Sequence, residues 1–127
     1  MKNEKTKKEL GCAIFSTNVF LRRFPISNLY LVRPRAVMAD GFSVSIQATE
    51  YTYCTPAMNH ARSYTDVELG FPSEEDKLIN EYTEYLEDDT YTDTVYPYVP
   101  VEIVDKLIEK HGGIVAVEGY HVDHWFK

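Results

Sequence analysis

An alternating segment behind an Asp-Gly pair limits the possible folds of this sequence more than any other feature. From Phe42 to Ala48, apolar and small polar residues alternate with a period of two. Because successive side chains of a strand point to opposite faces, this pattern predicts a strand with one buried face. Asp40 and Gly41 separate it from the apolar residues of 29–39, and such a pair favours a tight turn with positive φ at both positions. We therefore predict a β-hairpin within residues 29–48.

The rest of the expected fold comes from four later segments. Residues 64–71 alternate again and predict a strand that ends at Pro72. Ser73 is a good helix N-cap, and the apolar residues behind it recur at helical spacing, which predicts a helix over about residues 73–89. A second helix is expected between Pro100 and Gly112, followed by a strand over 113–122. This order predicts an α+β fold, a small antiparallel sheet with two helices packed on one face.

Charge is distributed unevenly along the chain. Residues 1–35 contain eight Lys or Arg and two acidic residues, whereas residues 36–127 contain five Lys or Arg and eighteen acidic residues. We expect a basic N-terminal arm over residues 1–28 and a single α+β domain over residues 29–127. Affinity for nucleic acid depends on Lys and Arg that displace counterions, so the acidic body is not expected to bind nucleic acid directly, nor an anionic membrane.

The cysteine content and the hydropathy of the sequence predict where in the cell the protein is located. Cys12 and Cys54 lack the number and spacing of a disulfide framework or a zinc site, which favours a reducing compartment. The basic start of the chain is followed by an apolar run that polar residues interrupt, so it is a poor signal peptide. No stretch approaches the roughly 18 apolar residues of a membrane span. We therefore expect a cytoplasmic protein.

The most unusual stretch is Ser73 to Asp93, which contains nine carboxylates and three tyrosines. If residues 73–89 form a helix, Glu87, Asp88 and Asp89 lie against its negative pole, where acidic side chains are destabilising. We infer that these carboxylates serve a partner, although a solvated face that keeps the protein soluble would also contain them. The expected partner-binding residues are Glu81, Glu84, Glu87, Asp88, Asp89, Tyr91 and Asp93.

Such a surface fits a basic partner. Carboxylates with tyrosines between them can imitate a phosphate backbone with bases, and they can meet arginines through charge-assisted hydrogen bonds and cation–π contacts. We therefore predict a non-enzymatic inhibitor or adaptor that docks its acidic surface onto a basic, nucleic-acid-binding protein. The alternative is a small-ligand binding protein for a nucleotide signal, with a site on the polar sheet face formed by Arg35, Ser43, Ser45, Gln47, Tyr51 and Tyr53.

Catalytic and metal-binding motifs are weak in this sequence. It contains no GxGxxG, Walker, HExxH or GxSxG pattern. Cys54 and His60 lack a recognisable nucleophile signature. The run from Glu87 to Asp93 lacks the central Gly and the terminal Glu of a calcium loop, and His121 and His124 lack a third ligand. We expect no enzyme, no metal and no cofactor.

Three strings resemble a known group of proteins. They are "VRPRAVMADGFSVSIQATEYTYCTP", "YTDVELGFPSEE" and "TVYPYVPVEIVDKLIEKHGGI". They resemble short uncharacterised proteins encoded by bacteriophages and prophages, over about residues 32–114. The resemblance implies a phage-type protein made in the cytoplasm of a bacterial host cell. Phages encode many small acidic proteins that block host nucleases, anti-CRISPR proteins among them, and this analogy of class and size favours an anti-defence role against a nuclease or CRISPR effector.

Overall fold

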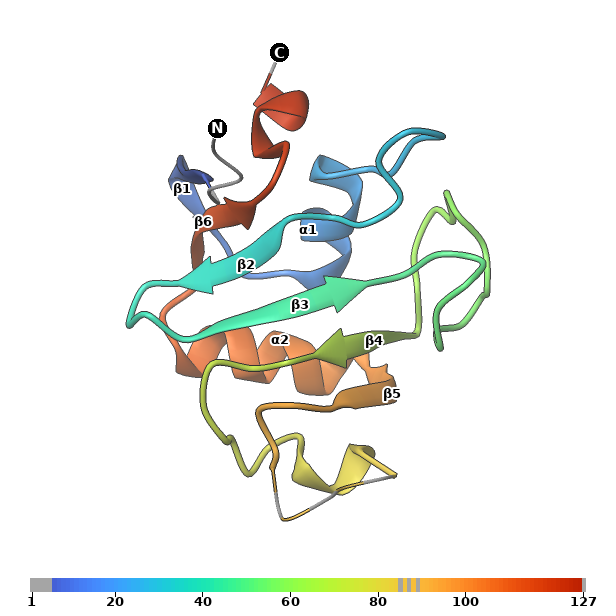
Figure 1. Ribbon diagram of the computed structural model, residues 1–127, viewed down its shortest axis with the longest axis vertical. Coiled ribbons are helices and arrows are strands. Elements are labelled where there is room, and N and C mark those ends of the chain that lie inside the picture. Colours follow the sequence, from blue (N-terminus) through green and yellow to red (C-terminus); the bar gives the residue numbers. More distant parts are fainter. Residues whose placement is uncertain (1–5, 85, 87, 89, 127) are drawn as a thin grey trace.

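The computed structural model describes residues 6–126 except 85, 87 and 89. Figure 1 shows one twisted antiparallel sheet of six strands in the order β1-β6-β2-β3-β4-β5. The expected α+β fold is confirmed. The strands are β1 (Thr6–Ile14), β2 (Arg35–Met38), β3 (Ser43–Gln47), β4 (Asp66–Gly70), β5 (Val95–Pro100) and β6 (Ile114–Gly119).

The central hairpin forms where the sequence predicts it. β2 pairs with β3, Ala36 opposite Val44, and the backbone N–H of Met38 donates to the carbonyl of Phe42 at 2.8 Å. Of the two turn residues, only Gly41 has a positive φ, of 96°. The expectation of positive φ at both turn positions is therefore wrong for Asp40. The carboxylate of Asp40 instead accepts from the Phe42 amide at 3.0 Å. This bond closes the turn locally, as Asp commonly does.

Two α-helices cover one face of the sheet, behind it in Figure 1. They are α1 (Thr17–Arg23) and α2 (Val101–Lys110). The amide and hydroxyl of Thr17 both donate to one carboxylate oxygen of Asp105, at 2.8 and 2.6 Å, so the two helices are joined directly. The core lies between them and the sheet. Its largest buried side chains include Phe20, Phe24, Phe42, Leu69, Ile79, Tyr96, Leu107 and Ile108.

The expected separate arm over residues 1–28 is wrong for the described part, residues 6–28. β1 pairs with β6 along Thr6 to Glu9 and again at Ile14, and the irregularity between these sections contains Gly11 at φ 86°. Phe20 and Leu21 of α1, and Phe24 directly after it, are buried in the core. The lysines of β1 hide this role in the sequence, because an edge strand keeps charged side chains on its solvent face.

The helix expected over residues 73–89 is also wrong. The described residues there form turns and the short 3-10 helix η1 (Asn80–Tyr82). The side chain of Asp76 points inward and accepts from the Leu78 amide, while its carbonyl accepts from Ile79. These short-range bonds replace helical ones, and Asp offers such competition readily. Like-charged neighbours one turn apart would also destabilise a helix here.

The two strands on either side of α2 in the sequence differ in predictability. The last strand is confirmed as β6, which ends at Gly119, and the 3-10 helix η2 (Val122–Phe126) follows. β5 was not expected, since Pro97 and Pro100 argue against a strand. It lies at the sheet edge, the place where proline is tolerated. None of the described helices has the length and apolar character that crossing a membrane requires.

Candidate functional site

The acidic segment, residues 74–93, lies beyond β5 at the lower end of the molecule in Figure 1. Glu81, Glu84, Asp88 and Asp93 are exposed there, and Tyr91 is half-buried. Glu87 and Asp89 were predicted as partner-binding residues too, but they fall outside the described residues. The sequence argument for a partner, that these carboxylates oppose the negative pole of a helix, is wrong because the described residues of the segment form no α-helix.

The exposed carboxylates are not neutralised by the fold. Across the described ranges, none of Glu81, Glu84, Asp88 and Asp93 forms an ion pair. Asp76 is different, because it is 4% exposed and lies 3.0 Å from the Lys110 ammonium. The segment therefore combines one internally paired carboxylate at its base with unpaired ones at its surface.

The base of the segment is fixed by a charged cluster. His111, at the end of α2, faces Asp40 through Nδ1 at 2.6 Å and Asp76 through Nε2 at 2.8 Å, and the Phe42 ring stacks on it. Burial lowers the pKa of His111, but hydrogen bonds to the two carboxylates outweigh it, so the pKa is raised overall. Burial likewise raises the pKa of Asp76, and bonds from Leu78, His111 and Lys110 lower it overall. The cluster thus stabilises a charged imidazolium between two carboxylates.

Two further contacts hold the other end of the segment. The buried Tyr96 of β5 donates its hydroxyl to the carbonyl of Tyr91 at 2.5 Å. Burial raises the pKa of Tyr96 to about 12, which keeps the hydroxyl a donor at neutral pH. Thr83 donates to the carbonyl of Val95 at 2.9 Å. The segment is therefore anchored to β5 at several points, and its carboxylates are presented by an attached surface.

A cleft adjoins this segment on the edge strand. Its volume is about 240 Å³, and we call it the tyrosine cleft, lined by Tyr53, Glu84, Thr94, Val95, Pro97 and Tyr98. The rings of Tyr53 and Tyr98 lie 5.8 Å apart at 51°, and these residues are 54% and 51% exposed. The amide of Tyr98 donates to the carbonyl of Tyr53 at 3.1 Å, and this bond joins β5 to the loop that contains Tyr53. The lining of the cleft therefore contains two half-exposed tyrosines and one carboxylate.

A second carboxylate lies close to the tyrosine cleft. Glu68 of β4 is half-buried, and burial raises its pKa despite a contact at 3.5 Å from the Tyr53 amide. In the described part of the chain no Lys or Arg pairs with it. A desolvated carboxylate without a cation is stabilised by any positive group that approaches it. Glu68 therefore adds to the attraction of this edge for cations.

The tyrosine cleft was only partly predictable. Glu84 was predicted as a partner contact and Tyr53 as part of an alternative ligand site, whereas Tyr98 was missed. Regular alternation would place Tyr96 and Tyr98, two residues apart, on the same face of a strand. The pairing of β5 with β4 is irregular here and Tyr98 has a φ of 54°, so Tyr96 is buried while Tyr98 is exposed. The prolines conceal β5 in the sequence, and no local pattern predicts this irregularity.

The residues of the alternative ligand site are used largely within the fold. Arg35 donates through Nε to the hydroxyl of Ser43 at 2.8 Å and through Nη2 to the carbonyls of Ser43 and Phe71. The Gln47 amide bonds to the backbone of Arg33 and to the hydroxyl of Ser45. Arg35 and Ser45 line one cavity, and Tyr53 lines another. Tyr51 is exposed in the loop after β3.

The other candidate chemistry has ordinary surroundings. Cys54 is buried, and its thiol contacts the carbonyls of Thr49 and Pro56 at 3.3 and 3.4 Å. In the part of the chain that the structure describes, no three His, Cys, Asp or Glu residues are placed to hold a metal ion. His124 stacks on Tyr30 with centroids 4.1 Å apart, so it belongs to an aromatic cluster at the C-terminal end.

Comparisons of this chain with protein-family models, with curated proteins and with solved structures found no match. The functional argument therefore depends on the geometry of the tyrosine cleft and of the acidic segment.

Proposed function

We propose that this protein is a non-enzymatic binding protein, an inhibitor or adaptor, which docks the acidic segment and the tyrosine cleft onto a basic protein surface. The tyrosine cleft is the observation that carries the proposal. An acidic surface alone would suit solubility equally well. A cleft lined by one carboxylate and two half-exposed tyrosines instead offers a site for a cationic side chain.

Arginine is the side chain that fits the cleft best. Its planar guanidinium can stack on a tyrosine ring while it donates two parallel hydrogen bonds to a carboxylate, and lysine offers only a point charge. Tyr53 and Tyr98 supply the rings, and Glu84 supplies the carboxylate. Glu68, whose pKa is raised by burial, gains from a nearby cation as well.

The surrounding carboxylates act at longer range. Glu81, Asp88 and Asp93 are exposed and unpaired within the described residues, so their field extends into solvent. Complementary charge of this kind accelerates encounter and excludes acidic partners more than it adds contact energy. A protein that binds nucleic acid presents the arginines that such a surface attracts, and occupation of them by this chain would exclude the nucleic acid. The partner class, a host nuclease or a CRISPR effector, rests on the resemblance to phage proteins.

A defined cationic probe tests the proposal. Hexa-arginine peptide, titrated by calorimetry, should bind the wild-type chain, and high salt should weaken the binding, because exposed charges are screened beyond roughly 10 Å at 0.1 M. Tyr98→Leu keeps the apolar volume and removes the aromatic face, and we expect it to weaken binding at least about tenfold when combined with Glu84→Gln.

The matched control removes the same charge elsewhere. Glu102 and Glu109 are exposed on α2, and Glu102→Gln with Glu109→Gln should change the affinity by less than about twofold. If this control weakens hexa-arginine as much as Glu81→Gln with Glu84→Gln does, net charge alone explains the binding and the proposed site is wrong. Equal binding of hexa-arginine by the wild type and by Tyr98→Leu would exclude the cleft.

A further inference from the structure

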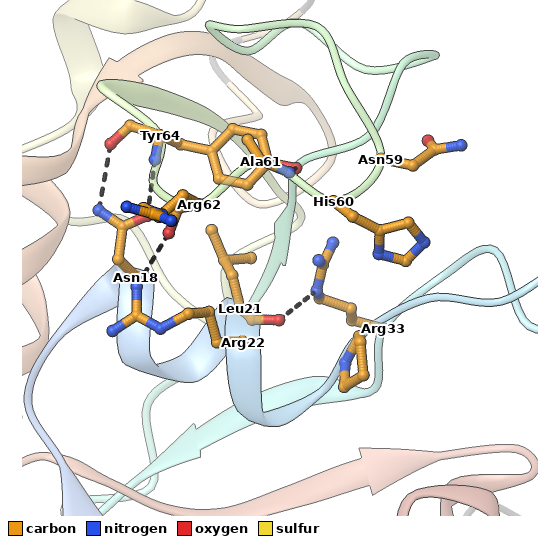
Figure 2. A pocket seen from close by; sticks show the side chains of 10 residues that line it. Asn18, Leu21, Arg22, Arg33, Asn59, His60, Ala61, Arg62 and Tyr64 are labelled. Atoms are coloured by element: carbon orange, nitrogen blue, oxygen red, sulfur yellow. Dashed lines mark hydrogen bonds between the residues drawn. The ribbon is translucent and has the colours of Figure 1, made fainter.

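A second cavity, far richer in positive charge, lies between α1, the loop after β3 and the residues that precede β2. Its volume is about 420 Å³, and its wall contains Arg22, Arg33, Arg62 and His60 beside apolar residues such as Leu21 and Pro25. We call it the basic cavity. Among the residues that the structure describes, no acidic side chain lines it. Figure 2 shows the Arg33 and His60 side chains pointing toward the same space.

Arg33 is the unusual member of the basic cavity. The residue is 4% exposed, and its Nε and Nη1 donate to the carbonyls of Leu21 and Ala48 at 3.3 and 2.9 Å. Within the described ranges no carboxylate pairs with it. Buried charges in proteins are nearly always paired, because a carbonyl dipole does not replace a counter-ion. Arg33 therefore lacks the anion that its burial calls for.

The neighbouring basic residues add further positive charge to the cavity. The Arg22 guanidinium donates to the backbone carbonyl of Arg62 at 3.2 Å, which brings the two residues together. The Arg62 guanidinium and the His60 ring make no hydrogen bond within the described part of the chain. Two amide side chains of the wall are already used, Asn18 with the backbone of Tyr64 and Asn59 with Glu50. The unused donors of the cavity are therefore cationic groups and an imidazole.

A purely structural role accounts for only part of this arrangement. The C-terminal end of a helix carries about half a negative charge at most, and basic residues there are favourable. α1 has seven residues and already ends in Arg22 and Arg23. One more buried guanidinium, in a cavity that Arg62 also lines, exceeds what that pole can balance. Like charges gathered at one cavity repel each other unless an anion joins them.

We propose that the basic cavity binds a small phosphate ester. Arginines recognise a phosphate through paired N–H donors, and several arginines around one anion are its usual setting. The volume lies within the range of pockets for small organic molecules and exceeds what inorganic phosphate fills. Leu21, Pro25 and Ala61 offer an apolar wall to the organic part of the ligand. The site is separate from the tyrosine cleft, so either proposal can fail without the other.

The test uses adenosine 5′-monophosphate as the probe, with adenosine and inorganic phosphate as its two halves. Calorimetry should show binding of the nucleotide, with each half at least about tenfold weaker. Arg22 and Arg62 are exposed, so Arg22→Gln with Arg62→Gln should fold normally and weaken the nucleotide at least about tenfold. The control Lys77→Gln with Lys106→Gln removes the same charge from exposed sites outside the cavity and should leave the affinity within about twofold.

Three results would overturn the proposal. They are the absence of nucleotide binding, an equal loss in the lysine control, and inorganic phosphate that binds as tightly as the nucleotide. Arg33→Lys provides an additional test, since it keeps the charge but loses the paired donors. If Arg33→Lys melts cooperatively and binds the nucleotide like the wild type, the buried guanidinium plays no part in recognition and the assignment is wrong.

Discussion

The acidic segment and the basic cavity hold unpaired charge in opposite ways. Glu81 and Glu84 are exposed to water, whereas Arg33 is enclosed, donates to the carbonyls of Leu21 and Ala48, and pairs with no carboxylate of the described residues. Water solvates an exposed carboxylate at little cost to the fold, but a buried cation without a counter-ion is costly. The difference suggests that the segment attracts its partner from a distance, and that the cavity selects a ligand by contact.

A second contrast lies within the acidic segment itself. Asp76 is buried between His111 and Lys110, and it is a structural residue, while the carboxylates further along make no ion pairs in the described chain. Removal of a carboxylate from the base should therefore change stability, and removal from the surface should change binding.

Asp76→Ala should lower the free energy of unfolding by about 3 kcal/mol, because it leaves His111 and Lys110 without their shared carboxylate. Asp93→Ala, at an exposed position, is the control and should change it by less than about 0.5 kcal/mol. Urea denaturation measures both. Equal effects would show that the base and the surface of the segment do not differ.

Arg33→Met should lower the free energy of unfolding by about 1–3 kcal/mol, because the carbonyls of Leu21 and Ala48 lose their donor in a buried place. Arg62→Met, on the same cavity but exposed, should stay within about 0.5 kcal/mol. Thermal denaturation of the two variants compares them directly. If Arg33→Met is more stable than the wild type, burial of the guanidinium destabilises the fold by more than its hydrogen bonds stabilise it.

The pH dependence of stability should reveal His111. Its pKa is raised in the folded state, so its contribution is complete below the unfolded value near 6.5 and is lost as the pH rises through the folded pKa. Asp40 and Asp76 have lowered pKa values, and their contribution is lost as the pH falls below about 3.8. Stability should therefore decline as the pH rises above about 6.5. In His111→Gln this decline should be absent, and a decline of the same size there would assign it to another group.

Glu81→Gln with Glu84→Gln should have the smallest effect on the fold. We expect the free energy of unfolding to stay within about 0.5 kcal/mol of the wild type, since neither side chain has an internal cation in the described structure. The same variant should bind hexa-arginine more weakly. A large loss of stability would mean that these carboxylates serve the fold.

The sequence predicts the elements that local pattern determines. The alternation of residues 42–48 and the Asp-Gly turn identify the central hairpin, and the stripe behind Pro100 identifies α2. Prediction from the sequence fails where contacts between distant residues determine the local structure. Residues 73–89 have a helical pattern, but Asp76 is held by His111, 35 residues away. The lysine-rich β1 becomes a strand only through pairing with β6.

The candidate sites, too, could be predicted only where they depend on a local sequence pattern. The acidic segment is visible in the sequence as a run of carboxylates, so Glu84 could be predicted. The tyrosine cleft and the basic cavity could not, because Tyr53 and Tyr98 lie 45 positions apart, and Arg22, Arg33 and Arg62 come from three segments. Only the fold brings them together.

The most direct test of the docking proposal is a nuclear magnetic resonance titration of the wild-type chain with hexa-arginine. We predict that the largest shifts fall on Tyr53, Glu84 and Tyr98, with smaller ones along the acidic segment and none at Glu102 or Glu109. Shifts of equal size at all exposed carboxylates, with the tyrosine signals unchanged, would contradict the proposed site.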